Sequence, residues 1–295
     1  MKISKHFFAS HMAAVITTTA LSIGLTVISN ASAETALTEV LAQRSEQEQA
    51  RDDARHPLET LNFFGVKPGM VVAEALPGGG WYTKILANYL GAHSTLYGVN
   101  YIDEMWPMFG FFDQAGIDKV LASTPAFPQT VAGFTDNGIA AQGFTFGTVP
   151  EDKKGTVDVF LLVRALHNLN RFEQQAGTYS QAMAAIYALV KPGGTVGVVQ
   201  HRAPESVDDS WADGSRGYLK QSFVIDSFEA AGFELVDSSN INSNPKDQPG
   251  AEDVVWRLPP TLMDSKSDEK RRAAMLAIGE SNRMTLKFSK PADRK

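Results

Sequence analysis

The sequence predicts an α/β sandwich built on a mainly parallel sheet, and two observations carry this prediction. Short apolar runs alternate with helical segments along most of the chain, which is the pattern of repeated β–α units. The run "TVDVFLLV", Thr156 to Val163, is apolar almost without interruption, as expected for a strand that helices cover on both faces.

Seven segments have the composition of strands, and helical segments separate most of them. The expected strands cover Val71 to Leu76, Thr95 to Val99, Gly143 to Phe146, Thr156 to Val163, Thr195 to Gln200, Phe233 to Ser239 and Met284 to Lys290. The helices between them are expected at Trp81 to Leu90, at Thr178 to Val190 with the turn Lys191 to Gly194 after it, and at Ser222 to Phe233.

Two further segments complete the expected single domain, residues 34–295. Residues 35–55 are rich in charged residues and helix formers, which predicts an exposed amphipathic helix before the first strand. Residues 241–282 interrupt the β–α rhythm with prolines and one charged helix. This insertion is too long for a plain loop, and we expect it to form a lid.

The first 33 residues have the pattern of a secretory signal peptide. Lys2 and Lys5 form a basic start, an uncharged apolar run covers Ala13 to Ile28, and "ASA" at residues 31–33 provides the small residues of a cleavage site. An uncleaved membrane anchor is the alternative, and the short run broken by Thr and Ser disfavours it. We therefore expect a periplasmic protein with no stable membrane insertion after cleavage.

Charge and cysteine content narrow the function classes. The chain carries a net charge of −6 at pH 7, which disfavours non-specific binding of nucleic acid. It has no cysteine, so it has no disulfide and no thiolate metal site. A small molecule is the expected partner, and nothing in the sequence indicates an oligomeric state.

Several motifs resemble those of one enzyme superfamily. The glycine turn after the first strand, "VDVFLLVRALHNL" and "LVKPGGTVGVV" are similar to the class I S-adenosylmethionine-dependent methyltransferases. "RHPLETLNFFGVKPGM", "PGGGWYT", "VVQHRAP" and "IGESNRMTLKFSKP" look like a bacterial group of exported predicted methyltransferases. The resemblance covers Arg51 to Lys290. It implies a Rossmann-like three-layer sandwich whose mostly parallel seven-stranded sheet ends in an antiparallel strand.

The resemblance also implies a site for S-adenosylmethionine. Glu74 matches the acid of the family's cofactor motif, Gly78 and Gly80 match its second and third glycines with Gly79 between them, and Leu76 occupies the place of the first glycine. The acid that holds the ribose is replaced by Asn100, with Asp103 close enough to substitute. The contact to the adenine amine has no clear match in this chain, where "GFTFGTVPED" offers only Thr145 and Thr148 before Glu151.

Polar residues after two expected strands are candidates for catalysis, because ligands of parallel sheets bind at the carboxyl ends of the strands. Arg164 and His167 follow the central strand, and His201 follows the fifth. Either histidine can serve as a general base, and the alternative is that each one caps a loop backbone. No short-range spacing of ligands indicates a metal site, and we expect none.

Four more residues and one cluster leave two interpretations open. Trp106, Phe109, Phe111 and Phe112 can wall an apolar pocket or pack in the core. The charged cluster "RDDARHP", residues 51–57, can line the cleft or form a salt-bridged helix end.

These features favour a periplasmic methyltransferase that uses S-adenosylmethionine on a small or apolar substrate. The first alternative is a binding protein that keeps the fold without catalysis, which the altered Leu76 and Asn100 favour. A weaker alternative is an NAD(P)-dependent oxidoreductase, since "GGGWYT" imitates a dinucleotide turn in which Thr83 replaces the third glycine.

Overall fold

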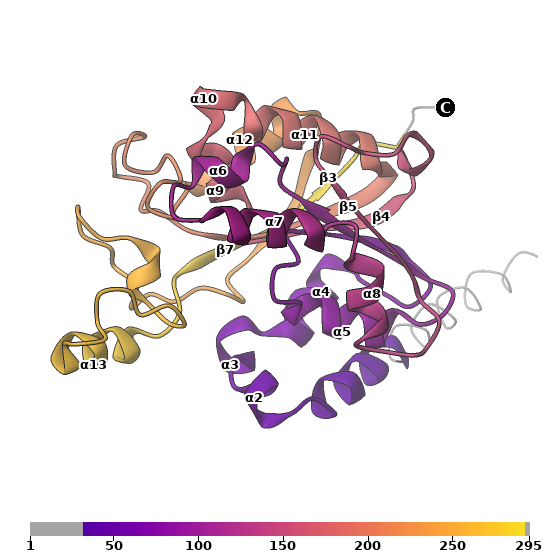
Figure 1. The fold of residues 1–295 in the computed structure, drawn as a ribbon, viewed down its shortest axis with the longest axis horizontal. Coiled ribbons are helices and arrows are strands. Elements are labelled where there is room, and N and C mark those ends of the chain that lie inside the picture. The colour runs from indigo at the N-terminus through magenta and orange to yellow at the C-terminus, as the bar shows by residue number, and fades with distance from the viewer. Residues whose placement is uncertain (1–31, 293–295) are drawn as a thin grey trace, which may run out of the picture.

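A computed structural model describes residues 32–292, and in this part of the chain seven strands form one sheet (Figure 1). The strands are β1 (Val71–Ala75), β2 (Thr95–Asn100), β3 (Ala140–Thr145), β4 (Val157–Val163), β5 (Val190–His201), β6 (Glu234–Ser239) and β7 (Arg283–Ser289). Their order across the sheet is β3-β2-β1-β4-β5-β7-β6. Only β7 runs antiparallel to its neighbours, β5 and β6, among these strands. The predicted fold class is confirmed.

Five strands match their expected bounds to within one residue at each end, and β3 and β5 begin several residues earlier than expected. β3 begins at Ala140 rather than at Gly143. β5 begins at Val190 rather than at Thr195, because Val157 pairs with Val190 while Val159 already pairs with Thr195. Residues 191–194, the expected turn, therefore lie within β5 as an irregularity that is not paired with β4.

One face of the sheet is covered by helical residues 32–42, α4 (Pro57–Phe64), α5 (Trp81–Leu90) and α8 (Phe127–Ala132). Leu61, Ile85 and Val131 from these helices are almost completely buried against Val72 and Val159 of the sheet. Alternate strand residues point to opposite faces, so a strand such as β4 contributes Val159 and Leu161 to this cluster and Phe160 to the opposite face.

The opposite face is covered by a second set of helices, which lies above the sheet in the view of Figure 1. Leu166, Ile186 and Phe228 from this set pack against Phe160 and Val198 of the sheet. The two apolar clusters on the two faces make the three-layer arrangement. The helices of this second set are α6 (Met105–Met108), α7 (Gln114–Ser123), α9 (Leu166–Arg171), α10 (Glu173–Ala176), α11 (Thr178–Leu189) and α12 (Gln221–Ala230).

The segment before the first strand is divided into short helices rather than forming one. Helical residues 32–42 are followed by α2 (Glu46–Gln49) and α3 (Asp52–Arg55). The division has a local cause, since the Glu48 carboxylate accepts hydrogen bonds from the backbone N and Oγ of Ser45, both at 2.9 Å, and this capping box starts a new helix. The segment folds onto the start of α5, where Nε1 of Trp81 donates to the carbonyl of Glu48 at 3.2 Å.

The insertion at residues 241–282 contains η2 (Val255–Arg257) and α13 (Glu269–Ile278). Figure 1 shows α13 far from the sheet, while Val255 of η2 is buried in a cluster with Ala203 and Tyr218. A buried ion pair between Arg257 and Asp247, with N···O 2.8 Å, holds the segment, and Nη1 of Arg257 donates to the Tyr218 hydroxyl at 2.7 Å. That the insertion acts as a lid stays a prediction.

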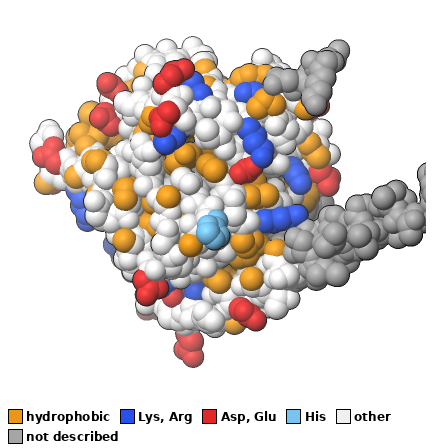
Figure 2. Space-filling view, turned by 90° about the vertical axis from the view of Figure 1, so that its right-hand side faces the viewer, with side chains coloured by type: hydrophobic (Ala, Val, Ile, Leu, Met, Phe, Trp, Pro, Cys, Tyr) orange, Lys and Arg blue, Asp and Glu red, His pale blue; other side chains and the backbone are white. Residues whose placement is uncertain are grey.

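The signal-peptide prediction lies outside the described residues except at its last two positions. Within residues 32–292, no helix has both the length and the apolar character that a membrane span requires. On the face of the molecule shown in Figure 2, acidic and basic side chains are interspersed with apolar ones.

Candidate functional site

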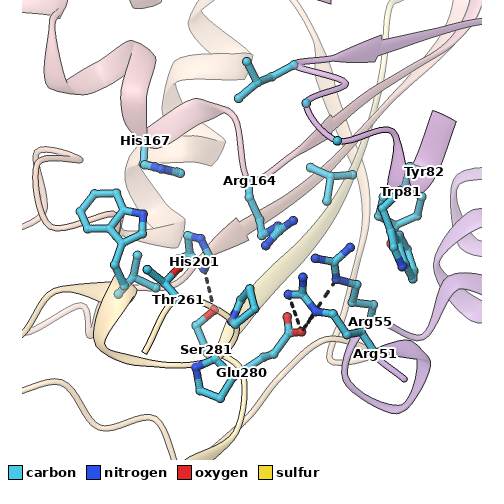
Figure 3. A pocket seen from close by; sticks show the side chains of 18 of the residues that line it. Arg51, Arg55, Trp81, Tyr82, Arg164, His167, His201, Thr261, Glu280 and Ser281 are labelled. Carbon is cyan, nitrogen blue, oxygen red and sulfur yellow. Dashed lines mark hydrogen bonds and ion pairs between the residues drawn. The ribbon is translucent and has the colours of Figure 1, made fainter. Parts of the chain in front are cut away.

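A cavity of about 450 Å³ lies at the carboxyl end of the sheet, where β1, β4 and β5 end (Figure 3). This is the edge at which parallel sheets bind their ligands. Side chains from four parts of the chain line it: the N-terminal segment, the turn after β1, the residues after β4 and β5, and the insertion. The lining includes Arg51, Arg55, Glu74, Leu76, Gly78, Gly79, Trp81, Tyr82, Arg164, His167, Asn168, His201, Trp256, Thr261, Glu280 and Ser281.

The glycine turn forms one wall of this cavity and keeps a left-handed backbone at three alternate positions. The φ angles are 51° at Leu76, 57° at Gly78 and 78° at Gly80. Leucine is strained in this region of the backbone map and glycine is not, so the turn has kept its shape although the first glycine is replaced. Gly80 is needed for space as well, because a Cβ there would lie 2.8 Å from Cζ of Phe134.

A second cavity, of about 520 Å³, lies on the other side of this turn, and Leu76 and Gly78 line both cavities. Asn100 lines the second cavity, but its side-chain amide already donates to Oγ1 of Thr124 at 2.8 Å. Asp103 is exposed and lines neither cavity, so Asn100 is the better placed of the two predicted ribose contacts.

The side chain of Glu74 is buried and contacts Thr83 at the start of α5, next to the glycine turn. The residue is 4% exposed, and Oγ1 of Thr83 donates to its carboxyl group at 2.6 Å. Burial raises the pKa of Glu74 to about 8, although the Thr83 hydroxyl lowers it in part. The carboxyl group is therefore mainly protonated at pH 7, and it adds little negative charge to the cavity that it lines.

The two histidines lie together in the first cavity. Their ring centroids are 5.4 Å apart, and Figure 3 shows both rings on the same side of Arg164. Nδ1 of His167 lies 3.3 Å from Oε1 of Gln200, and Nδ1 of His201 lies 2.6 Å from Oγ of Ser281. One nitrogen of each ring is thus held by a polar partner.

Both histidines are poor bases in this environment. Burial lowers the pKa of His167 to about 4, with Arg164 and Arg171 acting in the same direction and Gln200 against it. Burial, His167 and nearby arginines hold the pKa of His201 well below its usual value. Both rings are therefore neutral at pH 7 and can accept a proton only as weak bases, and their role as general bases stays a prediction.

Arginines form the opposite part of the cavity (Figure 3). Nε of Arg51 donates to Oε1 of Glu280 at 2.5 Å, while Nε of Arg55 lies 3.8 Å from the same oxygen. The Arg55 guanidinium also lies 4.3 Å from the centre of the Trp81 ring. In the charged cluster at residues 51–57 both interpretations therefore hold in part, since its arginines line the cavity and Asp52 pairs with Arg44 outside it.

Several predicted residues lie elsewhere. Thr145 and Thr148 contact each other through their hydroxyls at 2.9 Å and line neither cavity. The aromatic run is divided: Trp106 and Phe112 line the second cavity, Phe109 is buried in the core and Phe111 is 71% exposed. Among the described residues, no group of three or more His, Cys, Asp or Glu side chains is placed to hold a metal ion.

Sequence reasoning missed the contribution of the insertion. Trp256, Glu280 and Ser281 line the first cavity, and the ring of Trp256 lies 6.0 Å from that of His167. The sequence did contain a signal for the positions of Glu280 and Ser281. An antiparallel last strand starts at the edge where the parallel strands end, so the residues just before it had to lie near His201.

No family model and no curated protein matches this chain. The solved structures that resemble it do so at low identity. The [4+2]-cyclase SpnF is 16% identical, with a TM-score of 0.52 over 85% of this chain and 84% of the other. A chain of the Haloferax volcanii complex formed with the Trm112 methyltransferase activator is 15% identical, with a TM-score of 0.50 over 84% of this chain and 95% of the other.

These two similarities establish the methyltransferase fold and leave the reaction open, because one of the two proteins is by name a cyclase. A SAM-dependent methyltransferase from Aquifex aeolicus is 14% identical, with a TM-score of 0.44 over 70% of this chain and 93% of the other.

Proposed function

We propose that this chain binds S-adenosylmethionine at the turn after β1 and methylates a small polar substrate. The observation that carries the proposal is the backbone of Leu76, Gly78 and Gly80, which keeps three left-handed positions at the carboxyl end of β1. Such a turn lets a ligand approach the main chain closely, and the free N–H groups at the start of α5 follow it.

The residues present fit the cofactor in part. The backbone of Gly78 to Gly80 would approach it, Glu74 would stabilise the turn, and Asn100 would face its ribose from the second cavity. Leu76 lines both cavities in the place of the family's first glycine, and the adenine contact has no acid. When bound, the cofactor would supply an already activated methyl group, so the chain's own task is to orient the acceptor and to exclude water.

The first cavity is the proposed acceptor site. Of the small and apolar acceptors that the sequence allowed, the arginines and histidines of the lining favour a small polar one. Action in the periplasm is part of the proposal, and it is supported by the signal-peptide pattern of residues 1–33. A cofactor made from ATP would then have to be delivered to that compartment.

Calorimetric titration of the chain from Glu34 onward tests the proposal, with S-adenosylmethionine and S-adenosylhomocysteine as ligands. We expect micromolar binding that Gly78→Val abolishes, since valine cannot adopt φ 57° without strain. Gly69→Val is the matched control, because Gly69 has a φ of 85° and lines neither cavity, so the same backbone strain arises away from the turn. Absence of binding at millimolar ligand would contradict the proposal.

A binding protein without catalytic activity is the second candidate. It is favoured by Asn100, whose amide is already engaged by Thr124. The oxidoreductase alternative gains no support. Thr83 occupies the place of the third glycine of a dinucleotide turn, and its hydroxyl donates a hydrogen bond to Glu74.

A further inference from the structure

The first cavity has an excess of positive charge. Three arginines line it, at positions 51, 55 and 164, and Glu280 is the only lining residue with an ionised carboxylate at pH 7 in the described part of the chain. Glu74 also lines the cavity, but burial keeps its carboxyl group mainly protonated. Arg283 adds a further charge just outside the lining, where its Nη1 lies 3.2 Å from the same Glu280.

This excess is costly without a ligand. Guanidinium groups stay charged in proteins, and charges removed from water destabilise the fold unless they are paired. The arginines act on one another, since Arg164 and Arg51 both lower the pKa of Arg55, to about 9, after burial as the larger cause. One carboxylate therefore does not neutralise the cluster.

Arg164 differs from the other two arginines of the lining because it has no ion-pair partner among the described residues, although Nη2 of Arg51 and Nε of Arg55 are also buried without a hydrogen-bond partner. Its Nε is buried and has no hydrogen-bond partner, and its side chain forms no ion pair with a described residue. Arg51 and Arg55, by contrast, both share Glu280. Figure 3 shows the Arg164 guanidinium between His201 and Arg55, in the middle of the residues that line the cavity.

The backbone of Arg164 is strained in a way that helps to place this side chain. Its φ angle is 60°, a left-handed conformation that non-glycine residues rarely adopt, and its N–H donates to the carbonyl of Val199 at 2.7 Å. Strained backbone of this kind costs on the order of 1–3 kcal/mol and gathers at functional sites. An unpaired guanidinium on a strained residue inside a cavity indicates a ligand that compensates for both.

We propose that this cavity binds a small molecule through an anionic carboxylate or phosphate group, and that Arg164 is the residue that pairs with this group. The planar guanidinium fork matches the oxygens of either anion. Asn168, which also lines the cavity and has a buried side-chain oxygen without a partner, can accept a hydrogen bond from a protonated group of the same ligand.

That this ligand is the methyl acceptor rests on the proposed function, whereas anion binding does not. Anion binding and the role of methyl acceptor agree chemically. Carboxylate and phosphate oxygens are already deprotonated at neutral pH, so their methylation needs no general base. The weakly basic histidines of this cavity suit such an acceptor better than an alcohol or an amine.

The carboxylate of the cofactor itself is the competing partner for Arg164. The two assignments differ in which ligand loses affinity when the guanidinium is removed. Arg164→Gln keeps a polar side chain and removes the charge, so its effects on an anion and on the cofactor can be measured separately.

The test uses calorimetric titration with succinate and with inorganic phosphate on the chain from Glu34 onward. We expect at least one of them to bind, with roughly tenfold or greater loss of affinity in Arg164→Gln, as for a broken charged pair. Arg272→Gln, a change at an exposed position of α13, is the matched control and leaves the affinity unchanged. Arg164→Lys keeps the charge without the fork, and an intermediate affinity is expected.

Two results would overturn the proposal: binding of neither anion by the folded wild-type chain, or equal binding by the wild type and Arg164→Gln. If Arg164→Gln loses affinity for S-adenosylmethionine and not for the anions, Arg164 pairs with the cofactor and the proposal is wrong. If anions bind through Arg164 and S-adenosylmethionine does not bind at all, the anion site stands and the proposed methyltransferase function fails.

Discussion

Oγ of Ser281 lies 2.6 Å from Nδ1 of His201, although 80 positions separate the two residues in the chain. The contact joins the end of the insertion to the end of β5, and both residues are almost completely buried. His201 pairs in the sheet with Arg283, so the strand register and the side-chain contact hold the same two segments together.

Removing this contact tests whether it stabilises the site. Ser281→Ala leaves Nδ1 of His201 without its partner inside the protein, and we expect a loss of about 1–3 kcal/mol in the free energy of unfolding. Urea denaturation of Ser281→Ala, His201→Asn and the double variant measures the coupling between the two side chains. Strictly additive losses would contradict the contact.

The turn after β1 makes opposite predictions for two adjacent glycines. Gly80→Ala introduces a Cβ 2.8 Å from the Phe134 ring at a φ of 78°, and we expect a loss of about 1–3 kcal/mol in stability. Gly79→Ala meets no atom within 4 Å and should leave stability nearly unchanged. Chemical denaturation of both variants checks this, and equal stabilities would contradict the role given to Gly80.

Leu76→Gly should remove a side chain that lines both cavities and relieve the strain at φ 51°. The relieved strain and the greater freedom of glycine in the unfolded chain are both about 1 kcal/mol and oppose each other, so we expect little change in stability. Affinity for S-adenosylmethionine should rise, as measured by calorimetry. Leu76→Ala is the control, because it also removes the side chain but keeps the strain. A folded Leu76→Gly variant with weaker binding would contradict this account.

The raised pKa of Glu74 predicts that the free energy of unfolding falls as pH rises. Its pKa is about 8 in the folded protein against 4.5 ordinarily, so the folded state binds more protons between these values. The resulting loss of stability between pH 4.5 and pH 8 is on the order of 4 kcal/mol. Glu74→Gln should remove this dependence, as seen by thermal unfolding of both proteins at pH 5 and pH 8. A parallel pH profile in the variant would show that Glu74 is ionised when folded.

The lowered pKa of His167 predicts that the free energy of unfolding also falls when pH drops below about 6.5. Its pKa is lowered to about 4 in the folded protein, so the unfolded chain binds the extra proton between pH 6.5 and pH 4. The contribution of the neutral ring is present above pH 6.5 and is lost as pH falls, by about 3 kcal/mol. NMR titration of the His167 ring measures the pKa directly, and an apparent value near 6.5 would refute the prediction.

Much of the fold could be predicted because its signals are local. Trp81 to Leu90 has the exact bounds of α5, since a glycine flanks the helix at each end. β3 was placed too late because Ala140 to Gln142 lack strongly β-forming side chains. Lys191 to Gly194 have the composition of a turn, and only the pairing of Val157 with Val190 places them inside β5.

The site was less accessible to sequence reasoning for a physical reason. Arg164, His167 and His201 follow strands, so the topology of the sheet was enough to bring them together. Trp256 and Glu280 come from an insertion without periodicity, whose path depends on contacts between distant residues such as Arg257 and Asp247. Such contacts leave no local pattern in the chain.

The antiparallel direction of β7 also sets the order in which the site can be built. Glu280 and Ser281 reach the cavity only when β7 inserts between β5 and β6, and this strand is the last of the seven along the chain. A ribosome makes the turn after β1 and the residues after β4 and β5 long before it makes β7. The carboxylate that pairs with Arg51 and Arg55 and the hydroxyl that contacts His201 are therefore the last parts of the cavity to be made.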